Sequence, residues 1–182
     1  MNIALILQQG SCQLFELFGL LPSGQAWQAE SGAIWSLRLD QRRPDYTTSA
    51  DAAGLPIFPG LVRWDELSSG EIRHALRFSA PATQRAFVFP ASHFASTSTD
   101  PSLPPMGLRL RLKASVDVSA YPPAARTILR ALQRFGMFLA ENGNALFFSG
   151  APDSHWNQAD LQTLEQVRGS DFEAVATGPL TR

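Results

Sequence analysis

The chain contains one cysteine and one lysine, and its scarcities exclude several classes of protein. A single cysteine, Cys12, cannot close an internal disulfide or form a cage of thiolate ligands around a metal ion. The net charge of −1 gives no general electrostatic reason to bind nucleic acid or an anionic membrane. No run of about 18 apolar residues is present, so the sequence predicts no transmembrane span.

The sequence signatures of common cofactor sites are also missing. The chain has no P-loop, no GxGxxG, no GxSxG, no CxxC and no helical HExxH motif. These motifs carry nucleotide binding, serine hydrolysis and zinc binding, and we therefore predict no cofactor. The opening stretch MNIALILQQG lacks a basic region and a small-residue cleavage site, which favours a strand over a signal peptide.

The apolar residues that are present suffice for a folded core. Hydrophobic residues make up 45% of the chain and charged residues 17%, a balance typical of folded proteins and unlike that of disordered ones. A length of 182 residues is enough for one core but cramped for two. The sequence therefore predicts a single domain over residues 1–182.

Short apolar runs open the chain. Residues 2–8, 12–18 and 33–39 are separated by glycine-containing turns, which predicts an antiparallel meander. Residues 40–59 have a weaker apolar signal and predict a long ordered loop, a feature that is often functional.

Three further strands are predicted in the middle of the chain. Residues 71–78 alternate between apolar and polar side chains, and residues 106–119 do the same, so each predicts a strand with one buried face. The unbroken run AFVF within residues 85–90 predicts a strand buried on both faces.

The pattern changes to a helical period after the paired prolines at 122–123. The sequence predicts a helix that ends at Gly136, and a second helix over residues 158–168 capped by Asn157. Between them, ENGN predicts the turn of a hairpin, and DFEAVA predicts a last strand. These elements together predict an α+β fold, mainly an antiparallel β sheet or sandwich with two or three short helices.

Acidic residues in WDELSSGE suggest chemistry. Hydrolysis of a glycosidic bond needs two carboxyl groups that face one bond, and Asp65 and Glu71 are the candidates for that catalytic pair. Arg73 and Arg77, on the same predicted strand face as Glu71, would keep it ionised. The alternative is that these acids are solvated residues of a turn.

Two histidines offer a different chemistry. His74 and His93, with Glu71 or Asp117, could hold a metal ion that activates a water molecule for hydrolysis of esters or lactones. On a strand, however, Glu71 and His74 would point to opposite faces. The alternative is a core-facing His74 that is hydrogen-bonded to the backbone, and we assign no metal ligands.

Aromatic rings lie near these acids in the sequence. Sugar rings stack on aromatic faces, so Trp64 and Tyr46 are candidates for a sugar platform, although core packing is the alternative for each. His155 and Trp156 are predicted to set the start of the second helix. The predicted substrate-binding residues are Trp64, Tyr46, Arg73, Arg77, Lys113 and Asp117.

Several long motifs carry a resemblance. The runs TSADAAGLPIFPGLVRWDEL, GEIRHALRF, SHFASTSTDPSLPPMGLRLRLKAS, ILRALQRFGMFLAENGN and GSDFE resemble a family of uncharacterised secreted bacterial β-rich proteins, over about Cys12 to Glu173. The family's motifs include the positions of Asp65, Glu71, His74, His93, Asp100, Lys113, Asp117 and Asn142. The resemblance implies an extracellular or periplasmic location. Some members are joined to carbohydrate-binding modules, which implies a polysaccharide-directed role.

This chain departs from the family pattern at its start. Members carry an export signal and further sequence ahead of the matched part, whereas this sequence begins at MNIALIL without an export signal. This departure leaves two interpretations open, a truncated reading frame or an exposed sheet edge that pairs with a second copy to form a homodimer.

Three functions remain open from the sequence. The first is a small hydrolase that acts on glycosidic bonds of a polysaccharide or oligosaccharide, with Asp65 and Glu71 as its carboxyl pair. Across the hydrolase hypotheses, the candidate catalytic residues are Asp65, Glu71, His74 and His93. The second is a non-catalytic binding module for a carbohydrate or a cell-surface partner. The third is a metal-assisted hydrolase of esters or lactones.

Overall fold

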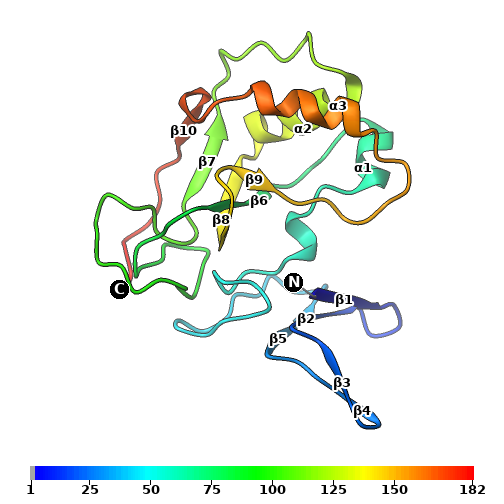
Figure 1. Cartoon of the computed structure of the whole chain (residues 1–182), viewed down its shortest axis with the longest axis vertical. Coiled ribbons are helices and arrows are strands. Elements are labelled where there is room, and N and C mark those ends of the chain that lie inside the picture. The colour runs from blue at the N-terminus through cyan, green and yellow to red at the C-terminus, as the bar shows by residue number, and fades with distance from the viewer. Residues whose placement is uncertain (1–2) are drawn as a thin grey trace.

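Two sheets of unequal size organise the structure, a computed structural model that describes residues 3–182 (Figure 1). Ten strands and three α-helices occur among these residues, in sheets that are mostly antiparallel. The predicted α+β class is thus confirmed. None of the helices in the described range is long and apolar enough to cross a membrane.

The small sheet forms from the start of the chain. Its strands lie in the order β1 (Ile3–Gln8), β2 (Gln13–Phe18) and β5 (Ser31–Ser36), all antiparallel. One face is buried because Leu14 and Trp35, which are paired across β2 and β5, both point inward. The predicted meander is therefore correct, but it missed the hairpin β3 (Leu21–Ser23) and β4 (Ala26–Gln28), which extends away from the body in Figure 1.

The segment that follows connects the two sheets. Residues 37–57 form the predicted long loop, which ends at the 3₁₀ helix η1 (Phe58–Gly60). The helix α1 (Trp64–Ser69) then replaces the turn considered for WDELSS. Acidic side chains favour the first turn of a helix, and Gly70, with φ of 83°, supplies the left-handed residue that ends it.

The large sheet provides the main core. Its order is β10 (Phe172–Ala174), β7 (Arg109–Leu112), β8 (Met137–Asn142), β6 (Leu76–Ala80) and β9 (Phe147–Phe148). The β6–β8 pair is parallel, and the other pairs are antiparallel. Helix α2 (Pro123–Arg134) buries Ile128, Leu129 and Leu132 in this core, and each such side chain contributes about 1.5–3 kcal/mol by leaving water.

Four strand predictions need correction. The strand predicted over residues 106–119 is confined to Arg109–Leu112 of β7. The strand predicted over residues 71–78 begins only at Leu76, so alternation does not apply to the residues before it. Residues 85–90 form no strand; Phe87 makes only isolated bridges, although it is buried. The strands on either side of ENGN do not pair with each other, because β6 lies between β8 and β9. Pairing between distant segments determines this strand order, and a local turn motif cannot predict it.

The end of the chain covers one side of α2. Helix α3 (Gln158–Gln162) continues into the 3₁₀ helix η2 (Thr163–Gln166), and a further turn, η3 (Gly169–Asp171), leads into β10. Asn157 caps α3 as predicted, because its side chain accepts hydrogen bonds from two backbone N–H groups of the first turn. Helices α2 and α3 lie in contact.

Candidate functional site

A hollow of about 710 Å³ lies between β9, α2 and the α3–η2 segment. Its lining is mostly apolar and includes the rings of Phe147, Phe148 and Trp156. Three polar side chains complete the lining, those of Gln158, Gln162 and Glu165. A large concave surface with a few convergent polar groups is the usual form of a ligand site.

Neighbouring rings fix the position of Trp156 in this hollow. The indole Nε1 of Trp156 donates a hydrogen bond to the carbonyl oxygen of Ala151 at 2.8 Å. Its ring meets Trp64 edge to face, with centroids 5.8 Å apart, and Trp64 in turn stacks on His155 at 5.3 Å. Trp64, predicted as a sugar platform, does not itself line the hollow and instead supports Trp156.

The two glutamines reach the hollow from one face of α3. Gln158 and Gln162 are four residues apart, and that spacing places side chains on the same side of a helix. The helix begins at a defined point because Asn157 Oδ1 accepts from the N–H of Ala159 at 3.0 Å and of Asp160 at 3.4 Å. Each carboxamide can both donate and accept hydrogen bonds.

The opposite wall comes from β9. Phe147 pairs with Ser79 of β6, and its side chain is 59% exposed. The hydroxyl of Ser79 donates to the carbonyl oxygen of Asn144 at 2.7 Å, which holds the loop before β9. The ring of Phe147 is therefore carried by a strand that is held in place on both sides of its start, by pairing with β6 and by the Ser79–Asn144 hydrogen bond.

A second cavity, of about 290 Å³, lies between the small sheet and the start of β6. Its lining includes Trp35, Asp40, His74, Arg77 and Phe138. His74 is the one predicted catalytic residue that lines either of these two cavities of the described chain.

Polar partners hold His74 at this second cavity. Its Nε2 lies 3.1 Å from Glu66 Oε2 and 3.2 Å from Arg63 Nη2, and its Nδ1 lies 2.9 Å from the carbonyl oxygen of Ala75. Arg63 also pairs with Glu66 at 2.8 Å. His74 is half-buried rather than core-facing, and the expected backbone contact is present.

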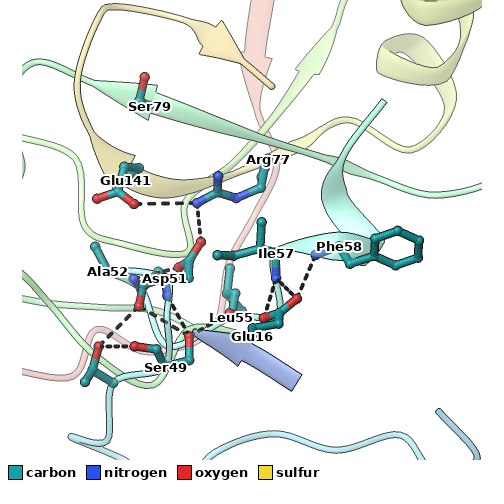
Figure 2. Close-up of polar contacts among 12 residues, drawn as sticks. Glu16, Ser49, Asp51, Ala52, Leu55, Ile57, Phe58, Arg77, Ser79 and Glu141 are labelled. Atoms are coloured by element: carbon teal, nitrogen blue, oxygen red, sulfur yellow. Dashed lines mark hydrogen bonds and ion pairs between the residues drawn. The ribbon is translucent and has the colours of Figure 1, made fainter. Parts of the chain in front are cut away.

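A buried ionic cluster links the long loop to the large sheet (Figure 2). Arg77 of β6 pairs with Asp51, and its Nη2 lies 3.6 Å from Glu141 Oε2 of β8. Burial raises the pKa of Asp51, although Arg77 and the N–H of Ala53 act in the opposite direction. Burial and the charge of Asp51 also raise the pKa of Glu141. Arg77 Nε is buried without a hydrogen-bond partner among the described residues.

Glu16 is a second buried acid, on the inward face of β2 (Figure 2). Its carboxylate accepts from the N–H groups of Ile57 and Phe58, at 2.8 Å each, and from Trp35 Nε1 at 3.0 Å. Burial raises the pKa of Glu16, and these hydrogen bonds lower it. The carboxylate thus fastens the small sheet to the chain around η1.

The predicted acid pair does not meet in either cavity. Asp65 is an exposed residue of α1, while Glu71 follows that helix and pairs with Arg73 at 2.8 Å and with Arg134 at 3.0 Å. Arg73 and then Arg134 lower the pKa of Glu71, as we expected for an arginine partner. The second predicted partner, Arg77, is instead held by the buried cluster.

The residues of the metal hypothesis each have their own contacts. His93 Nδ1 lies 2.9 Å from the carbonyl oxygen of Ala52, and Asp117 accepts from the N–H of Ser119 at 2.8 Å. The hydrogen bonds of His93 and Asp117 therefore involve neither His74 nor Glu71. Within residues 3–182, no group of three or more His, Cys, Asp or Glu side chains is arranged to hold a metal ion.

The remaining predicted binding residues make structural contacts. Lys113 Nζ donates to the carbonyl oxygen of Ser170 at 2.8 Å, and the hydroxyl of Tyr46 donates to that of Arg182 at 3.0 Å. Tyr46 also packs edge to face on Phe87. Neither Lys113 nor Tyr46 lines the hollow.

Sequence reasoning missed the residues that shape the hollow and the cluster. Trp156 was assigned only to the start of α3, whereas it also lines the hollow. One usable signal was Glu16, which stands on the inward, apolar face of the alternating run QLFELF. A charge at such a position indicates a buried polar contact. No comparable local signal pointed to Glu141, because its partners come from distant segments.

The comparisons with known proteins add no identification. No protein-family model matches the chain, and no curated protein or solved structure was found to be similar to it. The resemblance to secreted bacterial proteins therefore stays a prediction.

Proposed function

We propose that the protein is a carbohydrate-binding module that holds neutral or amino sugars in the hollow beside α3. The observation that carries the proposal is the combination of aromatic rings and polar planar groups around one open concavity. Phe147 and Trp156 offer ring surface, and Gln158, Gln162 and Glu165 offer hydrogen-bonding groups.

This combination suits the two-sided chemistry of a sugar. The C–H face of a pyranose packs on an aromatic ring, and its hydroxyl groups exchange hydrogen bonds with amides and carboxylates. Trp156 is held by Ala151 and Trp64, so little conformational freedom is lost when a ligand covers it. The hollow is also large enough for a ligand of more than one sugar unit, because ligand sites span about 300–1,000 Å³.

The charge of the lining selects among saccharides. Among the described residues that line the hollow, Glu165 is the one ionisable side chain, and no lysine or arginine is present. A uronate or sulfate group would lose its hydration there and would find no cation to compensate it. A neutral sugar avoids that cost, and a protonated amino sugar gains the attraction of Glu165.

The position of the acids favours binding over hydrolysis. A glycosidase places two carboxyl groups roughly 5–10 Å apart across the scissile bond. The hollow contains one carboxylate, Glu165, while the predicted pair Asp65 and Glu71 lies outside its lining. We therefore expect retention of a polysaccharide without release of product.

Affinity electrophoresis tests the proposal. Native gels are cast with a neutral glucan, with chitosan or with polygalacturonate, and mobility is compared with that in an empty gel. We expect retardation by the neutral or amino polymer and none by the acidic one. Replacing Phe147 by alanine should abolish the retardation.

A matched variant shows whether the position of the Phe147 ring, and not only its aromatic character, is responsible for the retardation. Trp27→Ala removes an aromatic side chain that is 68% exposed on the β3–β4 hairpin, outside the hollow lining, and should leave retardation unchanged. Equal loss in both variants would indicate nonspecific aromatic adhesion. Retardation that survives Phe147→Ala would refute this binding site, and reducing ends released by the wild type would restore the hydrolase prediction.

A further inference from the structure

Within residues 3–182, the outer edge of the small sheet pairs with no further strand and lacks the usual protection against such pairing. Strand β1 is the first strand of that sheet in the order β1–β2–β5, and its register with β2 is regular over all six residues. Its sequence, IALILQ, contains no charge, proline or glycine. Natural edge strands are normally shortened, charged or kinked to prevent such pairing.

Apolar side chains of β1 are also exposed on both sides of the strand. Ile6 and Leu7 are each 49% exposed, although they point to opposite faces. On the outer face, Ile6 lies across from Phe15, which lies across from Ile34 of β5, where the side chain is 58% exposed. An apolar row thus crosses the whole sheet and reaches its open edge.

The other edge of the sheet is less available. The N–H of Ser36 in β5 donates to Gln41 Oε1 at 2.9 Å, so a side chain already occupies that backbone donor. Strand β5 also contains Gly32, which weakens a strand for pairing. The two edges therefore differ, and β1 is the one suited to a partner strand.

We propose that β1 pairs with β1 of a second copy of this chain, antiparallel and about a two-fold axis perpendicular to the sheet. A register centred on Leu5 would place Leu5 opposite Leu5, Ala4 opposite Ile6 and Ile3 opposite Leu7 of the second copy. Each opposed pair is apolar, so the strand meets itself without a like-charge contact. This self-complementarity is the argument for a second copy as the occupant.

The same axis keeps the faces of the two sheets in agreement. Residues directly opposite in an antiparallel pair point to the same side, so inward residues of one copy continue the inward face of the other. The outer row of Ile6, Phe15 and Ile34 would then extend across the junction into the second copy. The association needs no residue of the hollow beside α3 and is independent of the carbohydrate proposal.

Sedimentation velocity of the full chain tests the pairing. Samples span about 1 μM to about 1 mM, the range in which weak assemblies form and dissociate. We expect a concentration-dependent dimer for the wild type. Ile6→Lys should raise the dissociation constant at least about tenfold, because like charges in an interface are strongly unfavourable.

Ile34→Lys is the matched control, since it places the same charge on the same exposed face two strands away from β1. It should leave the dimer intact. Ala4→Lys is a second edge variant in case Ile6→Lys does not fold, and it should dissociate the dimer as well. The near-ultraviolet circular dichroism of buried Trp35 reports whether each variant is folded.

Three results would overturn the proposal. The first is a wild type that stays monomeric over the whole range. The second is a dimer that folded edge variants leave intact. The third is equal dissociation by Ile34→Lys, which would show that the sheet faces meet instead of the β1 edges.

Discussion

Around Arg77 the protein buries charged groups among polar partners, whereas beside α3 it leaves aromatic rings at an open hollow with one acid. The two regions share the large sheet, since Arg77 lies on β6 and Phe147 lies on the strand paired with it. The ionic region joins segments that are far apart in the sequence. The side chains of the hollow contribute less to holding segments together, because several of them remain exposed.

This difference separates two reasons for a polar residue to be present. Asp51 and Glu141 have displaced pKa values, which by themselves would mark a functional site. Their partners, however, are the arginine and backbone groups that fasten the loop of residues 37–57 to β6 and β8. Displaced pKa values here report burial and attachment, and the ligand site is expected where charge is sparse.

The largest expected effect comes from breaking the ionic region. Asp51→Ala would leave Arg77 buried without its closest counter-charge, and removing one partner of a buried pair costs about 3–5 kcal/mol of unfolding free energy. Urea unfolding followed by tryptophan fluorescence measures the loss. Asp65→Ala, at an exposed acid, is the control and should have little effect. A similar unfolding free energy for both variants would mean that the cluster does not hold the loop.

The next effect is a dependence of stability on pH. Burial raises the pKa of Glu16 and Glu141 above the ordinary value of 4.5 and that of Asp51 above 3.8, so the folded state binds protons more tightly than the unfolded state. The sign follows from linkage: stability falls as pH rises from the ordinary value through the raised values. Urea unfolding at about pH 5 and about pH 8 should therefore show greater stability at the lower pH.

Neutral variants identify the groups responsible for that slope. Glu16→Gln and Glu141→Gln cannot ionise, so each should flatten the decline in stability between those two pH values. Surface acids whose pKa is lowered act in the opposite direction, but only when the pH falls below their ordinary values; they are Glu71, Asp100, Asp117 and Asp153. A slope that both variants leave unchanged would assign it to other groups.

The contrast between the regions also explains what the sequence could predict. Local patterns were sufficient for the strands around Leu14 and for the capped helix after Asn157, because period and capping are properties of neighbouring residues. They also gave the α+β class. They failed where pairing partners are distant, as in the insertion of β6 between β8 and β9.

The candidate site shows the same limit more strongly. Closeness in sequence suggested that Asp65 and Glu71 act together, yet α1 ends between them and Arg134 from α2 pairs with Glu71. The hollow forms from α2, β9 and α3, and no sequence motif predicts that these three elements lie together. A pattern can nominate side chains, but the long-range packing decides which of them face one another.

A smaller effect is expected within the hollow. Glu165→Gln keeps the size and hydrogen-bonding capacity of the side chain but removes the charge, so it should weaken retention by chitosan about three- to tenfold and leave retention by a neutral glucan unchanged. Affinity electrophoresis at several polymer concentrations gives the ratio. Glu30→Gln, at an exposed acid outside the hollow lining, is the control. Equal weakening for both polymers would show that the charge of Glu165 does not distinguish amino sugars from neutral sugars.

The smallest effect is expected at Glu71, one of the two acids that the sequence suggested as a catalytic pair. Its carboxylate is held by Arg73 and Arg134 at the surface, and exposed ion pairs contribute little to stability because water and salt screen them. Glu71→Gln should leave both the melting curve and the retention of polysaccharide unchanged, since Glu71 lies outside the hollow lining. If the wild type hydrolyses a glycosidic bond and this variant does not, while binding is intact, then Glu71 is catalytic. The catalytic surface would then be separate from the binding hollow.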